Sequence, residues 1–190
     1  MSMEVLVETS ARHAHITQEH LEILFGKGYE LTKKKDLSQP GQYACAERVD
    51  VVGPKKTLAG VSILGPVRPS TQVELSLTDA RSIGVNAPVR ESGDIAGSGA
   101  CKLVGPCGSV EIPQGVIAAA RHLHMSKAQA AFFGLKDGQV VSLRSGGERS
   151  VVFEDVVVRA GDGHDLEVHL DTDESNAAAM AGSVMMEVIL

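Results

Sequence analysis

Two copies of one histidine motif carry the most distinctive chemistry of the chain. Each copy has the order Arg-His-x-His, and the two copies are Arg12-His13-Ala14-His15 and Arg121-His122-Leu123-His124. On an extended segment, residues i and i+2 point to the same side, so each copy can present two imidazoles to one metal ion. Imidazole is a common ligand of zinc and of other transition metals. The motifs therefore predict two metal-ligand pairs.

Each pair needs a third ligand, because a catalytic zinc site normally has three protein ligands and one open position. Both motifs are followed by a capped helix and, later, by a strand that ends in Thr-Asp, VELSLTDA at 73–80 and LEVHLDTDE at 166–174. Aligning these strands gives three pairs: Leu77 with Leu170, Glu74 with Glu167, and Ser76 with His169. We expect His20 and His164 at the surface. The predicted ligand sets are His13, His15 and Glu74 at one ion, and His122, His124 and His169 at another.

Arginines near these residues favour an anionic substrate. Arg12 and Arg121 adjoin the ligands, and Arg68 follows Gly-Pro-Val six residues before Glu74. A guanidinium binds phosphate bidentately and keeps its charge at any working pH. The chain contains no P-loop, no G-x-G-x-x-G that opens a helix and no G-x-S-x-G elbow. Nucleotide hydrolysis, Rossmann-type dinucleotide binding and serine hydrolysis are therefore disfavoured.

Short strands and a few capped helices must position these residues. Helices are predicted after Thr17 up to residue 25, after Thr78 up to Gly84, after Ser126 up to Gly134, and over 171–181. Strands are predicted at 5–8, 48–52, 57–64, 72–77, 101–104, 109–112, 116–120, 139–144, 149–158, 166–170 and 184–190. Residues 27–45 and 86–99 are expected to be loops. With no Trp, 20 Gly and 7 Pro, this order predicts a mainly β chain with an aliphatic core. The internal repeat predicts two pseudo-symmetric small β-barrels, each capped by short helices.

Charge and composition exclude several classes of protein. The net charge is −6, whereas a nucleic-acid or membrane-surface binder would show a basic stripe. No apolar run approaches the roughly 20 residues of a membrane span, and no leader pattern opens the sequence. We therefore expect a cytoplasmic protein without nucleic-acid or membrane partners. Its three cysteines show no CxxC spacing, so we expect buried, reduced thiols.

Several long stretches resemble the PduL-type phosphate acyltransferases (phosphate propanoyltransferases). They are SARHAHIT, YELTKKKDLSQPGQYA, ILGPVRPSTQVELSLTDA, GVNAPVRESGD, KLVGP, GVIAAARHLHMS and HLDTDESNAA. The resemblance implies two zinc ions per chain, held by the two ligand sets above, with Arg68 as the residue that binds phosphate. It also implies reversible acyl transfer between coenzyme A and inorganic phosphate. In that family the first strand completes the C-terminal barrel, which implies barrels of residues 17–113 and of 1–16 plus 114–190.

The resemblance also sets further expectations. The substrates would be a propanoyl or acetyl thioester of coenzyme A and phosphate, and the protein would be a homodimer. Contacts to coenzyme A are not predicted beyond the candidates Lys33 to Lys35, Arg90 and the 86–99 loop. Relatives that enter bacterial microcompartments carry an amphipathic N-terminal extension, which is not seen here, so we expect the cytoplasm rather than a microcompartment lumen.

Two other functions remain open on the residues alone. A di-metal hydrolase, acting on a thioester or a phosphate ester, would also use H-x-H pairs with scattered His and acidic ligands, and its product would be a free acid. A cupin-like metal-binding module would bind metal without turnover. Product analysis separates these alternatives from acyl transfer.

Overall fold

The computed structural model describes residues 3–190 and separates into two compact units. The C-terminal unit combines the N-terminal segment up to Ser10 with Ser38–Pro40 and Ala120–Leu190, and the N-terminal unit comprises Ala11–Leu37 and Gly41–Ala119. These divisions differ from the expected boundaries after residues 16 and 113. Residues 13–15 belong to the N-terminal unit because they pair with strands of that unit.

The N-terminal unit is built on a closed ring of six strands. In ring order these are β4 (Tyr43–Val52), β5 (Thr57–Gly65), β2 (His13–His15), β6 (Gln72–Glu74), β9 (Ser109–Ala119) and β8 (Gly99–Val104), which returns to β4. Two short strands extend it, β3 (Lys33–Asp36) beside β4 and β7 (Val89–Arg90) beside β9. Its helices are α1 (Gln18–Phe25) and α2 (Leu77–Ile83).

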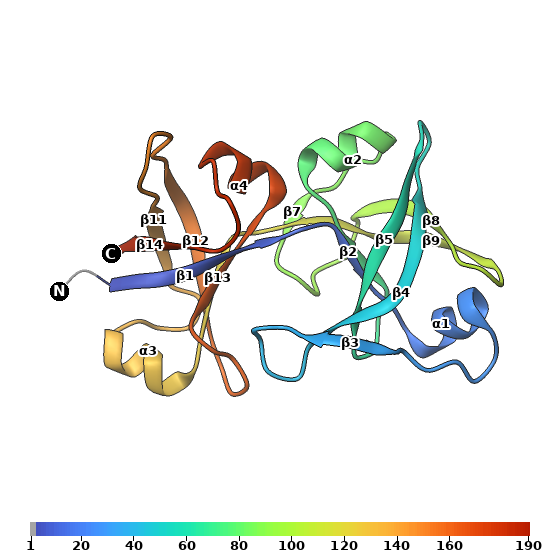
Figure 1. Cartoon of the computed structure of the whole chain (residues 1–190), viewed down its shortest axis with the longest axis horizontal. Helices are drawn as coiled ribbons and strands as arrows, with labels where there is room; N and C mark the ends of the chain where they lie inside the picture. Colours follow the sequence, from blue (N-terminus) through green and yellow to red (C-terminus); the bar gives the residue numbers. More distant parts are fainter. Residues whose placement is uncertain (1–2) are drawn as a thin grey trace. The chain divides into compact units, whose positions relative to one another are not determined.

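The C-terminal unit is a second closed barrel. Its strands, in order, are β1 (Met3–Ser10), β13 (Glu167–Asp171), β10 (His122–Met125), β12 (Val152–Ala160), β11 (Val140–Arg144) and β14 (Val184–Ile189). Figure 1 shows β1, the first strand of the chain, running along β13 and β14, to which it is hydrogen-bonded. Its helices are α3 (Lys127–Phe133) and α4 (Thr172–Ala177). The prediction of a mainly β fold with two helix-capped barrels is confirmed.

The alternation of each histidine motif decides which way its imidazoles point. Ala14 and Leu123, the middle residues of the two motifs, are fully buried and belong to the separate aliphatic cores of the two barrels. Successive strand residues point to opposite faces. The flanking histidines therefore lie on the outer face of each barrel wall, where a metal can reach them without disturbing the core.

Helix starts were predicted most accurately where a capping residue precedes the helix. α1 begins after Thr17 and α3 after Ser126, and α3 has the complete capping box with Gln129. The cap of α2 was predicted wrongly, because Ser76 rather than Thr78 accepts from the N–H of Asp79.

Strand boundaries were less accurate. β6 ends at Glu74, three residues earlier than expected, and β3 and β7 lie in segments predicted as loops. The two strands expected around Pro113 are one continuous strand, β9. All three cysteines are free, but Cys107 is exposed rather than buried. Across residues 3–190, no helix is long and apolar enough to cross a membrane.

Candidate metal centres

The first cluster of possible metal ligands lies on β2 and β6 of the N-terminal unit. His13 stands opposite Glu74 in the antiparallel pairing of these strands. One ligand atom each of His13, His15 and Glu74 lies within 4.8 Å of the others, and the three residues are only 6 %, 2 % and 8 % exposed. Nε2 of His13 is 3.5 Å from Oε2 of Glu74. The chain thus brings together all three residues that were predicted for this centre.

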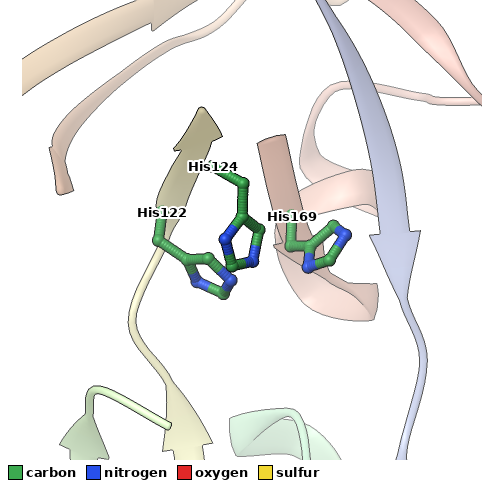
Figure 2. Close-up of side chains that lie close together, drawn as sticks. All are labelled: His122, His124 and His169. Carbon is green, nitrogen blue, oxygen red and sulfur yellow. The ribbon is translucent and has the colours of Figure 1, made fainter. Parts of the chain in front are cut away.

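The second cluster lies on β10 and β13 of the C-terminal unit. Figure 2 shows the rings of His122, His124 and His169 converging from these two strands. Their ring centroids are 4.5 to 5.2 Å apart, and one ligand nitrogen of each lies within 4.8 Å of the others. His122 and His169 are direct partners in the antiparallel pairing. This is the second predicted set.

Backbone carbonyls select the same tautomer for the first histidine of each motif. Nδ1 of His13 is 2.8 Å from the carbonyl oxygen of Ala11, and Nδ1 of His122 is 2.8 Å from that of Ala120. A carbonyl only accepts, so Nδ1 carries the proton and donates it. The lone pair is then on Nε2 in both rings. A histidine that binds a metal usually donates its other ring N–H to such an acceptor.

Burial keeps the second histidine of each motif neutral. Burial and the nearby charges of His13 and Arg68 lower the pKa of His15 to about 3. Burial and the neighbouring histidines lower the pKa of His124 to about 2. Nδ1 of His124 is buried and has no hydrogen-bond partner within the described residues. A buried neutral imidazole with an unsatisfied nitrogen is suited to metal coordination, because a metal ion would satisfy that nitrogen.

The pairing registers correct the predicted alignment of the two halves. His13 pairs with Glu74 and His122 with His169, whereas His15 pairs with Gln72 and His124 with Glu167. Glu74 therefore corresponds to His169, and Gln72 corresponds to Glu167. The alignment that placed Glu74 opposite Glu167 was wrong by two residues.

The residue that supports the third ligand differs between the two centres. In the N-terminal unit, the amide of Gln72 donates to Oε1 of Glu74 at 2.6 Å. In the C-terminal unit, Nε2 of His169 lies 3.3 Å from Oε2 of Glu167. A carboxylate is thus the third candidate ligand in one centre, and the acceptor beside the third candidate ligand in the other. The His₂Glu and His₃ donor sets fit a zinc-type metal ion.

Glu167 was not predicted to take part in the site. Burial by itself would raise the pKa of its carboxyl, but hydrogen bonds from His169, Ser38 and Gln39 lower it to about 2. Gln39, a buried side chain of the C-terminal unit, donates to Oε2 of Glu167 at 2.9 Å. The other oxygen, Oε1, is buried and has no partner within the described residues. Gln39 lies in a segment predicted as a loop, and only tertiary structure reveals its role.

Comparison with known proteins identifies the family. The sequence profile of phosphate propanoyltransferases matches residues 6–181. A phosphate propanoyltransferase of Sebaldella termitidis is 50 % identical over 92 % of this chain and 82 % of its own length. Those of Lachnoclostridium phytofermentans and Thermotoga maritima are 50 % and 48 % identical, over 97 % and 93 % of this chain and 87 % and 84 % of their own lengths. The chain belongs to the phosphate propanoyltransferase family.

Arg68, for which the resemblance to this family implies phosphate binding, lies beside the first centre. Its guanidinium is 3.4 Å from Oγ of Ser92 and 3.5 Å from Oε1 of Gln42. Ser92 in turn donates to Glu74 at 2.8 Å. Arg68 is thus one side chain, that of Ser92, away from the first centre. Ser92 was missed because a serine in a Gly-containing loop gives no sequence signal.

The arginines of the two motifs have other partners. Arg12 donates to both carboxylate oxygens of Asp79 at 3.0 Å, and Arg121 donates to Glu174. Both acids lie in the first turn of a helix, α2 or α4. These ion pairs hold a helix start to each motif. They also offset the two positive charges that were predicted to attract an anionic substrate.

Proposed function

We propose that the protein is a phosphate acyltransferase that interconverts acyl-coenzyme A plus inorganic phosphate and acyl phosphate plus coenzyme A. The observation that carries this proposal is the match to phosphate propanoyltransferases over residues 6–181. The two clusters of possible metal ligands and the arginine beside one of them support it. An anion and a thioester carbonyl are the reactants that such a site suits.

We propose one zinc ion at each centre, held by His13, His15 and Glu74 and by His122, His124 and His169. Each set supplies three ligands, which are imidazoles or a carboxylate. Catalytic zinc sites likewise have three protein ligands of these types and one open position. A bound zinc ion would supply positive charge for phosphate or for the oxyanion that develops on the thioester carbonyl.

In this proposal Arg68 binds and orients the phosphate nucleophile. One phosphate oxygen attacks the thioester carbonyl, the C–S bond breaks, and the thiolate leaves and takes up a proton to give coenzyme A. Because phosphate is itself a nucleophile, no serine or cysteine has to form a covalent intermediate. Ser92 and Gln72 both donate to Glu74 and so hold this carboxylate in place. Positioning of this kind can contribute roughly 7–11 kcal/mol to lowering the barrier.

The acyl group is propanoyl or acetyl in this proposal. One additional methylene in an apolar pocket changes the binding free energy by only about 1–3 kcal/mol. The site can therefore turn over both the propanoyl and the acetyl thioester. Rates with the two thioesters, compared as kcat/KM, determine which is preferred.

A thiol-release assay tests the proposal. Propanoyl-coenzyme A or acetyl-coenzyme A is mixed with metal-replete or chelated protein, with and without phosphate. We expect thiol release only when phosphate and metal are both present, with acyl phosphate as the product. Thiol release that does not depend on phosphate, with a free acid as the product, would show hydrolysis instead. Metal binding without any turnover would indicate a binding module.

A further inference from the structure

Arg159 lies next to the three-histidine centre of the C-terminal unit. It is on β12, which pairs in parallel with β10, and its register partner is His124. Register partners on neighbouring strands point to the same face of the sheet. Val158, the residue before it, points into the barrel core and is fully buried. The half-buried side chain of Arg159 therefore shares the outer face with His124.

The positive charge of Arg159 has no counterion within residues 3–190. Its guanidinium makes no ion pair and no hydrogen bond to a side chain or carbonyl there, unlike Arg12, Arg121 and Arg144. Arg149 also has no such partner, but it is exposed to solvent in the connection between β11 and β12. Desolvating a charge without a partner is costly. A half-buried arginine in this state is suited to bind an anion.

His164 completes the surroundings of Arg159. Its ring stacks on that of His124, with centroids 4.6 Å apart and planes at 26°. An imidazole carries at least one N–H in either protonation state, so His164 can donate a hydrogen bond to an anion beside His124. The charge of Asp137 also acts on His164, and Oδ1 of Asp137 accepts from the backbone N–H of Ala160. His164 was expected at the surface, but it is half-buried against this centre.

We propose that Arg159 and His164 form a subsite for a phosphate oxyanion beside the three-histidine centre. The planar guanidinium offers two parallel N–H donors with the spacing of phosphate oxygens, and His164 adds a third donor. The three ligand residues of the centre are histidines and none is a carboxylate, so a divalent ion bound there would leave positive charge to attract an anion. The subsite rests on the proposed function, since it supplies phosphate binding for that reaction.

The oxyanion can come from inorganic phosphate or from the phosphate groups of coenzyme A, and the test separates these sources. The first variant, Arg159→Met, removes the positive charge but keeps a long side chain. The second, Arg159→Lys, keeps the charge but removes the parallel N–H donors of the guanidinium. Arg149→Met is the matched control on the same barrel. Binding of inorganic phosphate, coenzyme A and pantetheine, which lacks phosphate, is measured by calorimetry on metal-replete protein. Metal content and the melting temperature are measured in parallel.

We expect Arg159→Met to weaken binding of one phosphate-containing ligand about tenfold or more, with a smaller loss for Arg159→Lys. Weaker binding of inorganic phosphate identifies it as the source. Weaker binding of coenzyme A with unchanged pantetheine binding identifies the phosphates of coenzyme A. Binding constants equal to wild type for all ligands overturn the subsite, and so does loss of bound metal in both variants. If the wild-type protein binds neither phosphate nor coenzyme A, the proposed function fails as well.

Discussion

Removal of the Glu167 carboxylate should weaken metal binding at one centre and leave the other unchanged. Glu167 is 2 % exposed and accepts from Gln39 at 2.9 Å, while His169 lies 3.3 Å away. Loss of an outer partner of a metal-binding histidine typically costs 10–100-fold in affinity. This range equals about 1.4–2.7 kcal/mol. We therefore expect Glu167→Ala to weaken metal binding at the three-histidine centre by that range.

The variant should also lower the stability of the metal-free protein. Deleting the carboxylate leaves the buried amide of Gln39 without its best acceptor, which typically costs about 1–3 kcal/mol. Gln39 also donates to the backbone oxygen of Asp165 at 3.2 Å, so the loss should lie near the lower end. Glu167→Gln keeps an acceptor oxygen and should cost less stability. It still removes the negative charge that strengthens the hydrogen bond from the N–H of His169.

Competition with a chromophoric chelator measures this prediction directly. Wild-type protein should show two metal equivalents, and in Glu167→Ala one equivalent should become weaker while the other keeps its affinity. The N-terminal centre, where Gln72 occupies the corresponding position, is the internal control. If both equivalents keep wild-type affinity in Glu167→Ala, the support that we assign to Glu167 is refuted. If both weaken alike, the variant acts through the fold and the reasoning also fails.

Two further predictions concern the N-terminal unit. Arg68→Ala should lower turnover at saturating phosphate about 10²–10³-fold with metal content unchanged. The control variant Arg48→Ala, at an exposed site, should retain full activity. A wild-type rate in Arg68→Ala would refute the role that we propose for Arg68. Burial opposes ionisation of Glu47, but hydrogen bonds from Thr32 and Tyr29 lower its pKa below 4.5. Because the unfolded state then binds more protons than the folded state, ionised Glu47 stabilises the fold. This contribution to the free energy of unfolding is present above pH 4.5 and is lost as the pH falls below it. The advantage of wild type over Glu47→Gln in urea unfolding should therefore shrink on acidification, and a constant difference down to pH 3 would contradict this reasoning.

Features that depend on local chemistry could be predicted from the sequence. Thr17 and Ser126 mark helix starts because a side-chain oxygen before a helix satisfies an N–H that has no partner within the helix. The histidine pairs are recognisable because the alternation of a strand fixes which side chains share a face. The motif also occurs twice, which raised it above chance and led to the ligand sets that the structure brings together.

Features that depend on long-range pairing could not be predicted. The sequence alignment of the two halves matched Leu77 with Leu170, which placed Glu74 opposite Glu167. The structure instead matches Ser76 with Asp171, since each caps the helix that follows its strand. The side-chain oxygen that caps a helix can come from Ser or from Asp. Equivalent capping positions therefore need not hold identical residues, and an alignment by residue identity misses them. Gln39 and Ser92 act through partners far away in the sequence, and no local pattern distinguishes them.

The exchange of Gln72 and Glu167 between equivalent positions explains why the two centres differ while their framework is the same. Where the third ligand is a carboxylate, an amide next to it donates a hydrogen bond and adds no charge. Where the third ligand is a histidine, a carboxylate next to it accepts the ring proton and leaves the other nitrogen for a metal. A change at one of these two strand positions without the other would leave a carboxylate beside a carboxylate, or a histidine without an acceptor. The pair must therefore change together, and the double variants Gln72→Glu with Glu74→His and Glu167→Gln with His169→Glu should retain metal better than either single change.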